Sequence, residues 1–468
     1  MPQISLKSPS ASEPCSTPRN SCFACLGRAF FLGILFATLS SCGSGGSSGS
    51  QAGYTVGGTV SGLTGTGLVL QNNAGNNLTI TGNGPFSFTA ALANGANYTV
   101  TILSYPGAPT QTCTVSNGMG TIAAAAVTNV AVNCVVAKVP RFAYVANLSD
   151  NTVSAYTVDA GTGALNAVGT PVATGLTPLS LAVDPAGRFA YVANAGNTVS
   201  AYAINAATGA LTSVGGSPFL AGLAPNSVVV DPTGKFVYVT NYDNNTVSIF
   251  TINAATGALT AAGTVMTGLN PHFVTVDPTG KFVYVANWSD NTISVYAINA
   301  ATGVLALVGS PIATGINPYS IAVDPTGRFA YVANEGSGTV SAYTLNATSG
   351  ALSAVGAPVI AGSSPESIVV DPTGRFVYVT NAFSNTVSAF AINSTTGALG
   401  HVSGTPFATG LTPNSVTVGS TGQFAYVVNQ SSNTVSAYAI NAASGALTVL
   451  GTPVATGLKP DSIVVVGW

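Results

Sequence analysis

Charged residues are scarce in this sequence. Lys, Arg, Asp and Glu make up 5% of its 468 residues, against about a quarter in an ordinary soluble domain. Ten of the charged residues recur at two positions of a repeated motif, where we expect them to serve turns: Arg188, Lys235, Lys281, Arg328 and Arg375, and Asp184, Asp231, Asp277, Asp324 and Asp371. No basic cluster is left over, which argues against nucleic acid as a partner.

A long apolar run is also missing, because no uncharged run reaches the roughly 18 residues that a membrane-spanning helix needs. The run nearest the start, Ala29–Leu39, is shorter and follows Arg19 and Arg28. These features are typical of a signal peptide. The run ends in Leu39-Ser40-Ser41-Cys42, which resembles the lipobox of bacterial lipoproteins.

The lipobox resemblance implies that residues 1–41 are removed and that Cys42 carries a lipid. Residues 42–53 are rich in Gly and Ser, so we predict a flexible tether there. An ordinary signal peptide followed by a chance cysteine is the alternative. The anchored form predicts a protein of the bacterial cell envelope, either periplasmic or surface-exposed.

Cysteine is rare beyond this leader. Three of the six cysteines lie in the segment predicted to be removed, so we interpret the Cys-x-x-Cys spacing there as accidental rather than metal-binding. After Cys42 only Cys113 and Cys134 remain. An even pair of cysteines in an oxidising compartment predicts a disulfide.

Residues 54–136 predict a small β-sandwich that serves as a spacer or docking domain. No His, Asp, Glu, Lys or Arg occurs between Tyr54 and Cys134, so the segment offers no catalytic group. It resembles the transthyretin-like and immunoglobulin-like spacer modules of bacterial surface lipoproteins. Short alternating segments bounded by Gly, Asn and Pro predict seven strands: 54–63, 67–72, 77–81, 85–90, 98–105, 112–116 and 127–135.

The rest of the chain repeats one motif, of which VDPTGKFVYVTN from Val230 is an example. Its tyrosine recurs every 46 to 48 residues, at Tyr144, Tyr191, Tyr238, Tyr284, Tyr331, Tyr378 and Tyr426. Seven repeats of this length indicate a repeat architecture. We therefore predict an all-β protein with a seven-bladed β-propeller over residues 138–468, preceded by the sandwich.

Each repeat predicts four strands, for example 271–276, 282–287, 292–297 and 304–308. The first repeat starts directly at its second strand, Arg141–Asn147, and the chain ends in Pro460–Val466, which matches a first strand. We therefore expect the C-terminal strand to complete the first blade and close the ring.

The words YVTN, YVAN, DPTGRF and NTVSAY resemble the seven-bladed YVTN and lactonase-like propellers, a group that includes 6-phosphogluconolactonase. The resemblance covers residues 138–468 and implies the fold. Members of the group hydrolyse lactones, bind surface ligands or form cell-surface layers, and the fold does not choose among these roles.

A candidate site follows from the residue after the proline of each first strand, which should surround the mouth of the central channel. Polar side chains that converge from separate blades are typical of a small-ligand site. These positions hold Leu179, Asn226, His272, Tyr319, Glu366, Asn414 and Asp461. The loops after the second strands add an outer rim of Asp150, Tyr242, Asp243, Trp288, Asp290, Glu335 and Phe383.

Three interpretations of this ring remain open. Glu366 as general base with His272 as its partner would suit hydrolysis of a lactone by an activated water. Oxygen atoms of Asp461, Glu366, Asn226 and Asn414 would suit a calcium ion, although no cofactor or metal is otherwise indicated. In the third, the side chains only line a hydrated channel.

An enzymatic role has few further signals. Only Pro271-His272-Phe273 approaches the Arg or His that lactonase-like enzymes place beside this proline, and only Glu335 matches their YVxNE word. No nucleophile elbow or zinc signature occurs. We therefore predict an envelope lipoprotein that binds or scaffolds an unknown small molecule or envelope protein, with a lactone hydrolase as the alternative.

Overall fold

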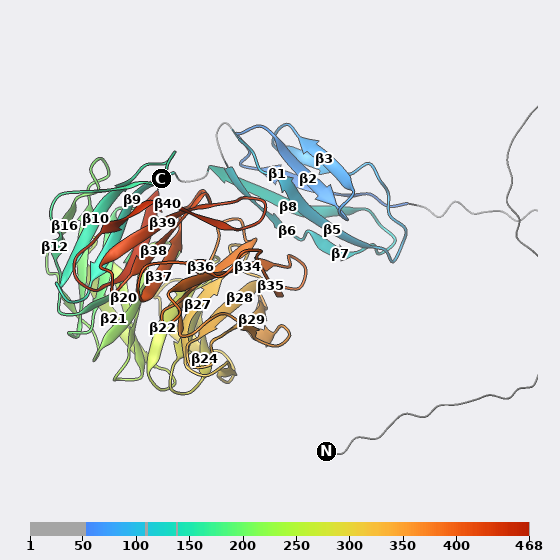
Figure 1. The fold of residues 1–468 in the computed structure, drawn as a ribbon. Coiled ribbons are helices and arrows are strands. Elements are labelled where there is room, and N and C mark those ends of the chain that lie inside the picture. Colours follow the sequence, from blue (N-terminus) through green and yellow to red (C-terminus); the bar gives the residue numbers. More distant parts are fainter. Residues whose placement is uncertain (1–52, 108–110, 137–138, 468) are drawn as a thin grey trace, which may run out of the picture. The chain divides into compact units, whose positions relative to one another are not determined.

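The computed structural model describes residues 53–107, 111–136 and 139–467. The predicted signal peptide, Cys42 and almost all of the predicted tether lie outside these ranges. The described chain is built from β-strands (Figure 1). Within these ranges no helix has the length and apolar character needed to cross a membrane.

The N-terminal domain contains two four-stranded sheets that share one hydrophobic cluster, to which Val60 and Val132 of one sheet and Leu68 and Val100 of the other contribute. In sheet order, the first is β4 (Gly84–Ser87), β1 (Val56–Ser61), β8 (Val127–Val136) and β6 (Gln111–Ser116). The second is β3 (Asn76–Ile80), β2 (Leu68–Asn72), β5 (Asn97–Ser104) and β7 (Met119–Thr121).

Strand β7 was missing from the sequence prediction, which gave seven strands instead of eight. Its three residues, Met119, Gly120 and Thr121, are all exposed. The segment therefore lacks the alternation of apolar and polar residues on which strand prediction depends.

The predicted disulfide is confirmed. Cys113 and Cys134 lie directly opposite each other in the register of β6 and β8, and their sulfur atoms are 2.04 Å apart. Both cysteines are buried in the domain core. The bridge therefore joins two neighbouring strands of one sheet.

The remaining chain forms seven blades, which follow one another from teal to red in Figure 1. The innermost strands are β41 (Pro460–Gly467), β13 (Pro178–Val183), β18 (Pro225–Val230), β22 (Pro271–Val276), β27 (Pro318–Val323), β32 (Pro365–Val370) and β37 (Pro413–Val418). The second strands are β9 (Pro140–Asn147), β14 (Phe189–Asn194), β19 (Phe236–Asn241), β23 (Phe282–Asn287), β28 (Phe329–Asn334), β33 (Phe376–Asn381) and β38 (Phe424–Asn429).

Two further layers complete each blade. The third strands are β10 (Thr152–Val158), β15 (Thr198–Ile204), β20 (Thr246–Ile252), β24 (Thr292–Ile298), β29 (Thr339–Leu345), β34 (Thr386–Ile392) and β39 (Thr434–Ile440). Two outer strands are continuous, β21 (Leu259–Met266) and β40 (Leu447–Ala455). The other five are split, into β11 (Leu165–Ala167) and β12 (Val172–Ala173), β16 (Leu211–Ser213) and β17 (Phe219–Leu220), β25 (Leu305–Leu307) and β26 (Ile312–Ala313), β30 (Leu352–Ala354) and β31 (Val359–Ile360), and β35 (Leu399–His401) and β36 (Phe407–Ala408).

The split outer strand corrects the predicted strand 304–308. The pairing stops at Leu307 and resumes at Ile312, just after Pro311. Proline has no backbone N–H to donate to a neighbouring strand. The interrupted stretch, residues 308–311, therefore includes one residue that cannot donate to the ladder.

The ring closes as expected. Strand β41 pairs with β9 in an antiparallel register that sets Ile463 opposite Val145, and it becomes the innermost strand of the first blade. Each innermost strand contacts the next, and β41 contacts both β37 and β13. The two ends of the propeller sequence are therefore held in one sheet.

Each blade packs against both of its neighbours, so strands such as β19 are buried along their whole length. Seven separate hydrophobic clusters lie between consecutive blades, and the last joins Phe424 and Tyr426 of blade seven to Tyr156 of blade one. A sheet covered on both faces needs apolar residues on both. The continuous apolar character of FVYVTN has this cause.

The repeated tyrosine links neighbouring blades. Tyr191 donates its hydroxyl hydrogen to the carbonyl oxygen of Gly257 in the next blade at 3.0 Å. All seven marker tyrosines make this bond, and Tyr426 completes the circle by donating to Gly163. The near-constant repeat length is therefore matched by a hydrogen bond at every junction between blades.

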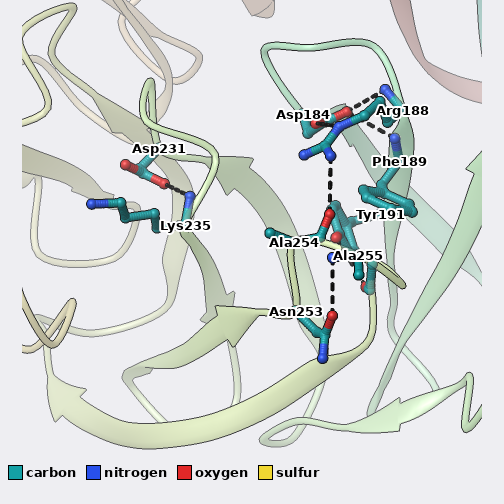
Figure 2. A network of polar contacts seen from close by, with 10 residues as sticks. Asp184, Arg188, Phe189, Tyr191, Asp231, Lys235, Asn253, Ala254 and Ala255 are labelled. Atoms are coloured by element: carbon teal, nitrogen blue, oxygen red, sulfur yellow. Dashed lines mark hydrogen bonds and ion pairs between the residues drawn. The ribbon is translucent and has the colours of Figure 1, made fainter.

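The repeated Asp and Arg residues serve turns between the first and second strands of the blades, two of which are drawn in Figure 2. Asp184 accepts hydrogen bonds from the backbone N–H groups of Arg188 and Phe189, which closes the turn between β13 and β14. The Arg188 guanidinium donates to the carbonyl oxygen of Ala254 in the next blade at 2.9 Å. The uniform charge pattern therefore has a structural role.

Candidate ligand site at the channel mouth

The predicted channel-mouth residues lie in the lining of one cavity of about 100 Å³. Each innermost strand begins with a buried proline, and the next residue turns its side chain toward the channel. The lining contains all seven of these residues: Leu179, Asn226, His272, Tyr319, Glu366, Asn414 and Asp461. Positions about 47 residues apart in sequence are thus brought together by closure of the ring.

Serine residues below this layer hold the innermost strands in place. The Ser227 hydroxyl oxygen accepts a hydrogen bond from the Val274 N–H in the next blade, at 3.3 Å. Equivalent bonds join four other neighbouring pairs of blades. The candidate site therefore lies on cross-linked strands rather than on loops alone.

A second cavity of about 410 Å³ opens above the first and shares four lining residues with it, Leu179, Asn226, His272 and Tyr319. Its wall also contains Ala224 and three loop residues, Tyr242, Trp288 and Glu335. These three occupy the same repeat position, directly after the asparagine that ends the second strand. Together the two cavities have the volume of a small-molecule site.

The other four predicted rim residues do not line either cavity. Asp150 and Asp290 accept hydrogen bonds from the backbone N–H groups of Leu458 and Leu269, both at 2.7 Å, and so fix surface loops. Asp243 and Phe383 are exposed, and Phe383 retains 76% of its accessible surface.

His272 is held in one tautomer. Its Nδ1 lies 3.1 Å from the backbone carbonyl oxygen of Tyr319, which can only accept a hydrogen bond, so Nδ1 carries the hydrogen. The ring lies 3.7 Å from the Tyr319 ring, centroid to centroid. Burial lowers the pKa of His272 to about 4, so the imidazole is neutral near pH 7 and Nε2 has a free lone pair.

Two glutamates from adjacent blades approach a shared serine. The Ser364 hydroxyl lies 3.2 Å from Oε1 of Glu366 and 3.4 Å from Oε1 of Glu335. Oε2 of Glu335 also accepts a hydrogen bond from the Trp288 indole N–H at 2.8 Å. Burial, together with the charges of Asp461 and Glu335, raises the pKa of Glu366 to about 8.

Asp461 is a third partly buried carboxylate. Its Oδ1 accepts hydrogen bonds from the side-chain amides of Asn414 and Gln430, both at 2.7 Å. Burial raises the pKa of Asp461 to about 7, and the two amides oppose this rise. The site therefore holds two carboxyl groups that change charge near neutral pH.

Ser364 and Gln430 were missed in the sequence prediction. Gln430 occupies the same repeat position as Trp288 and Glu335, so aligning the seven repeats on that position would have found it. Ser364 precedes the proline of β32, where other blades carry Thr, Ala, Asn or Lys. Its role depends on the two glutamates beside it, and no sequence signal marks it.

Carboxylates dominate the electrostatics of the site. Neither cavity lining includes Lys or Arg. Lys459 lies in the loop before Asp461, but its side chain is exposed and belongs to neither lining. Burial and the negative charges of Glu366, Asp461 and Glu335 raise the pKa of the Tyr319 hydroxyl well above its usual value.

A calcium site is poorly supported by these contacts. Among the described residues, no group of three or more His, Cys, Asp or Glu side chains could hold a metal ion. Asn414 also turns its N–H group, not its oxygen, toward Asp461. Calcium requires six to eight oxygen ligands, and the amide orientation works against such a set.

Comparison with known proteins identifies the family to which this propeller belongs. The sequence matches the family described as "Lactonase, 7-bladed beta-propeller" over residues 90–221, 195–276, 219–315, 273–366 and 321–464. The chain belongs to this family. A comparison with curated proteins gives no significant match.

Several solved structures share the propeller of this lactonase-family chain. A Bacteroides uniformis protein with the provisional name 6-phosphogluconolactonase is 21% identical, with a TM-score of 0.64 over 70% of this chain and 100% of its own. The periplasmic gluconolactonase of Pseudomonas aeruginosa is 20% identical, with a TM-score of 0.61 over 70% and 99%. A Lactobacillus plantarum protein is 23% identical, with a TM-score of 0.61 over 70% and 99%. Such identities establish the shared fold.

The chemistry available to this family member is proton transfer and polar binding. His272 presents a neutral Nε2, and Glu366 titrates near neutral pH. In the described part of the chain no hydrogen bond joins these two residues, because His272 bonds to Tyr319 and Glu366 to Ser364. They therefore face one cavity as separate groups and not as a hydrogen-bonded pair.

Proposed function

We propose that this protein is an envelope-anchored binding protein whose propeller holds a small molecule at the channel mouth. The observation that carries the proposal is the pair of connected cavities, where aromatic rings and buried carboxyl groups converge from separate blades. Leaving carboxyl groups buried without a cation is energetically costly. A polar ligand that contacts them would account for their placement.

The envelope location rests on sequence features and on the disulfide. The leader, the lipobox-like Leu39–Cys42 and the Gly/Ser segment predict lipid anchoring at Cys42. The disulfide between Cys113 and Cys134 suits an oxidising compartment. In this proposal residues 54–136 act as a spacer between the tether and the propeller. The periplasmic location of the Pseudomonas aeruginosa relative is in line with it.

The binding role is tested by a thermal-shift screen of the full chain against sugars, sugar lactones, amines and calcium. A ligand at about 100 times its dissociation constant adds roughly 2.7 kcal/mol to the free energy of unfolding. We expect a shift in melting temperature that disappears in Tyr319→Ala and persists in Phe383→Ala. Tyr319 lines the cavities, whereas Phe383 is exposed and lines neither of them.

A negative screen would turn attention to protein partners on the same face. Six blades expose one apolar side chain in the loop before the innermost strand: Leu176, Leu223, Leu269, Ile316, Leu411 and Leu458. No shift with any compound would therefore favour the scaffolding role, in which an envelope protein contacts this surface.

Lactone hydrolysis is the second candidate, favoured by the family match and by the neutral His272. In this scheme Nε2 of His272 or the ionised Glu366 takes a proton from water as its oxygen attacks the lactone carbonyl carbon. The ring C–O bond breaks, and the leaving oxygen is protonated to give a hydroxy acid.

Hydrolysis is measured by acid release from sugar lactones at constant pH. We expect Glu366→Gln and His272→Gln to lower kcat at least 100-fold if both groups transfer protons, while the melting temperature at pH 6 stays within a few degrees of wild type. Unchanged turnover in both variants would rule out this mechanism.

A further inference from the structure

Carboxyl groups line the cavities of the channel mouth without a compensating cation. Glu335, Glu366 and Asp461 line them, and neither lining contains Lys or Arg. The nearby Lys459 side chain is exposed and belongs to neither lining. An anionic ligand, such as a phosphorylated sugar, would add like charge to a partly desolvated site.

Aromatic rings form the other part of the wall. Tyr242, Trp288 and Tyr319 all line the larger cavity, beside Glu335. Tyrosine and tryptophan faces attract cations, most strongly where water is excluded. The hydrogen bond from Trp288 to Glu335 also fixes the carboxylate against the indole edge. Rings and carboxylates that line one cavity suit a cation with an organic surface.

From this arrangement we infer that the ligand of the channel mouth is a small organic ammonium ion, held by Glu335 and the surrounding aromatic rings. This inference rests on the proposed binding function and names its ligand class. The larger cavity, about 410 Å³, has the volume for such an ion. A bare metal ion fits less well, because aromatic carbon replaces the oxygen ligands that it requires.

The affinity for an ammonium ion should depend on pH. Burial raises the pKa of Glu366 to about 8, with help from neighbouring carboxylates, and the pKa of Asp461 to about 7. At pH 7 Glu366 is therefore mostly protonated and Asp461 about half protonated. His272, Tyr319, Ser364, Asn414 and Gln430 lie beside them, and Tyr242 lines the second cavity. None of these side chains supplies a positive charge near pH 7. A bound cation favours the ionised carboxylates, so its binding releases protons and tightens as pH rises through about 7 to 8.

The test compares ammonium ions with uncharged molecules of the same shape. Isothermal titration calorimetry on the full chain would use two permanently charged ammonium ions at pH 6 and pH 8.5, choline against 3,3-dimethylbutan-1-ol and acetylcholine against 3,3-dimethylbutyl acetate. Glucose and glucose 6-phosphate would serve as the uncharged and the anionic sugar. We expect at least one ammonium ion to bind ten times or more tighter than its uncharged counterpart. Its affinity should rise several-fold between the two pH values, with proton release visible in buffers of different ionisation enthalpy.

Matched variants separate charge from shape. Glu335→Gln should weaken the ammonium ion at least tenfold and leave the uncharged molecule unchanged. Asp159→Asn is the control, because Asp159 lies in an exposed turn on the opposite face where Asn205 and Asn253 occupy the same repeat position.

The outcomes distinguish the two proposals. If an uncharged sugar or a phosphorylated sugar binds more tightly than every ammonium ion, and Tyr319→Ala abolishes that binding, the binding function stands and the cation inference is wrong. If no compound of any charge binds, both are wrong. An affinity for the ammonium ion that falls between pH 6 and 8.5 would also overturn the inference.

Discussion

Replacing Glu366 by glutamine should stabilise the protein increasingly as the pH rises. The side chain is 9% exposed, and burial together with Asp461 and Glu335 raises the pKa of its carboxyl group to about 8. A carboxyl group whose pKa is raised by folding binds its proton more tightly in the native state. Its contribution to stability is therefore complete below about pH 4.5 and is lost as the pH rises through about 8. Glutamine keeps the shape of the side chain and removes the charge.

The size of the effect follows from the difference between the two pKa values. A rise from 4.5 to about 8 is roughly 3.5 units, and each unit corresponds to about 1.36 kcal/mol, so the ceiling is roughly 5 kcal/mol. For roughly 330 propeller residues, an unfolding entropy of about 2.1 cal/mol/K per residue gives roughly 0.7 kcal/mol per degree. The variant should melt up to about 7 °C above wild type at pH 9.

The assay is differential scanning calorimetry of wild type and Glu366→Gln in steps between pH 5 and pH 9. The melting temperatures should differ least at pH 5, separate steadily up to about pH 8 and then level off. Asp159→Asn is the control, since Asp159 is exposed and hydrogen bonds from Thr162 and Gly161 lower the pKa of its carboxyl group. A constant difference between wild type and Glu366→Gln over the whole range would refute the reasoning.

Three further predictions concern the framework. Tyr426→Phe removes the hydroxyl that bonds to Gly163 across the closing junction, which should cost about 1–3 kcal/mol in chemical denaturation; an unchanged midpoint would contradict this. Deleting residues 460–468 exposes the edge of β9, so we expect aggregation or loss of cooperative melting, whereas a monomer with wild-type melting would show that closure is dispensable. Replacing Cys113 and Cys134 by serine opens a link across 21 residues and should destabilise the N-terminal domain by about 3 kcal/mol, with the fluorescence of propeller tryptophan unaffected; altered fluorescence would contradict an effect confined to that domain.

The repeats made most of the propeller predictable. Strands β22 and β23 have the bounds that their repeat motif predicts, because a sheet covered on both faces requires a continuous apolar run. The pairing of β41 with β9 was also predictable, since the first repeat lacks an innermost strand and the last segment supplies one. Local deviations were harder to predict, as β7 and the split outer strands show, because they depend on pairing rather than on hydrophobic pattern.

The candidate site was also predictable only in part. Repeat position alone determined that His272, Tyr319, Glu366 and Asp461 face the channel, because equivalent residues of a closed ring occupy equivalent places. Only the tertiary structure brought Ser364 and Glu335 to Glu366 and Gln430 to Asp461. It also decided the tautomer of His272 and the raised carboxyl pKa values. These properties depend on burial and on distances between blades, which form only when the ring closes.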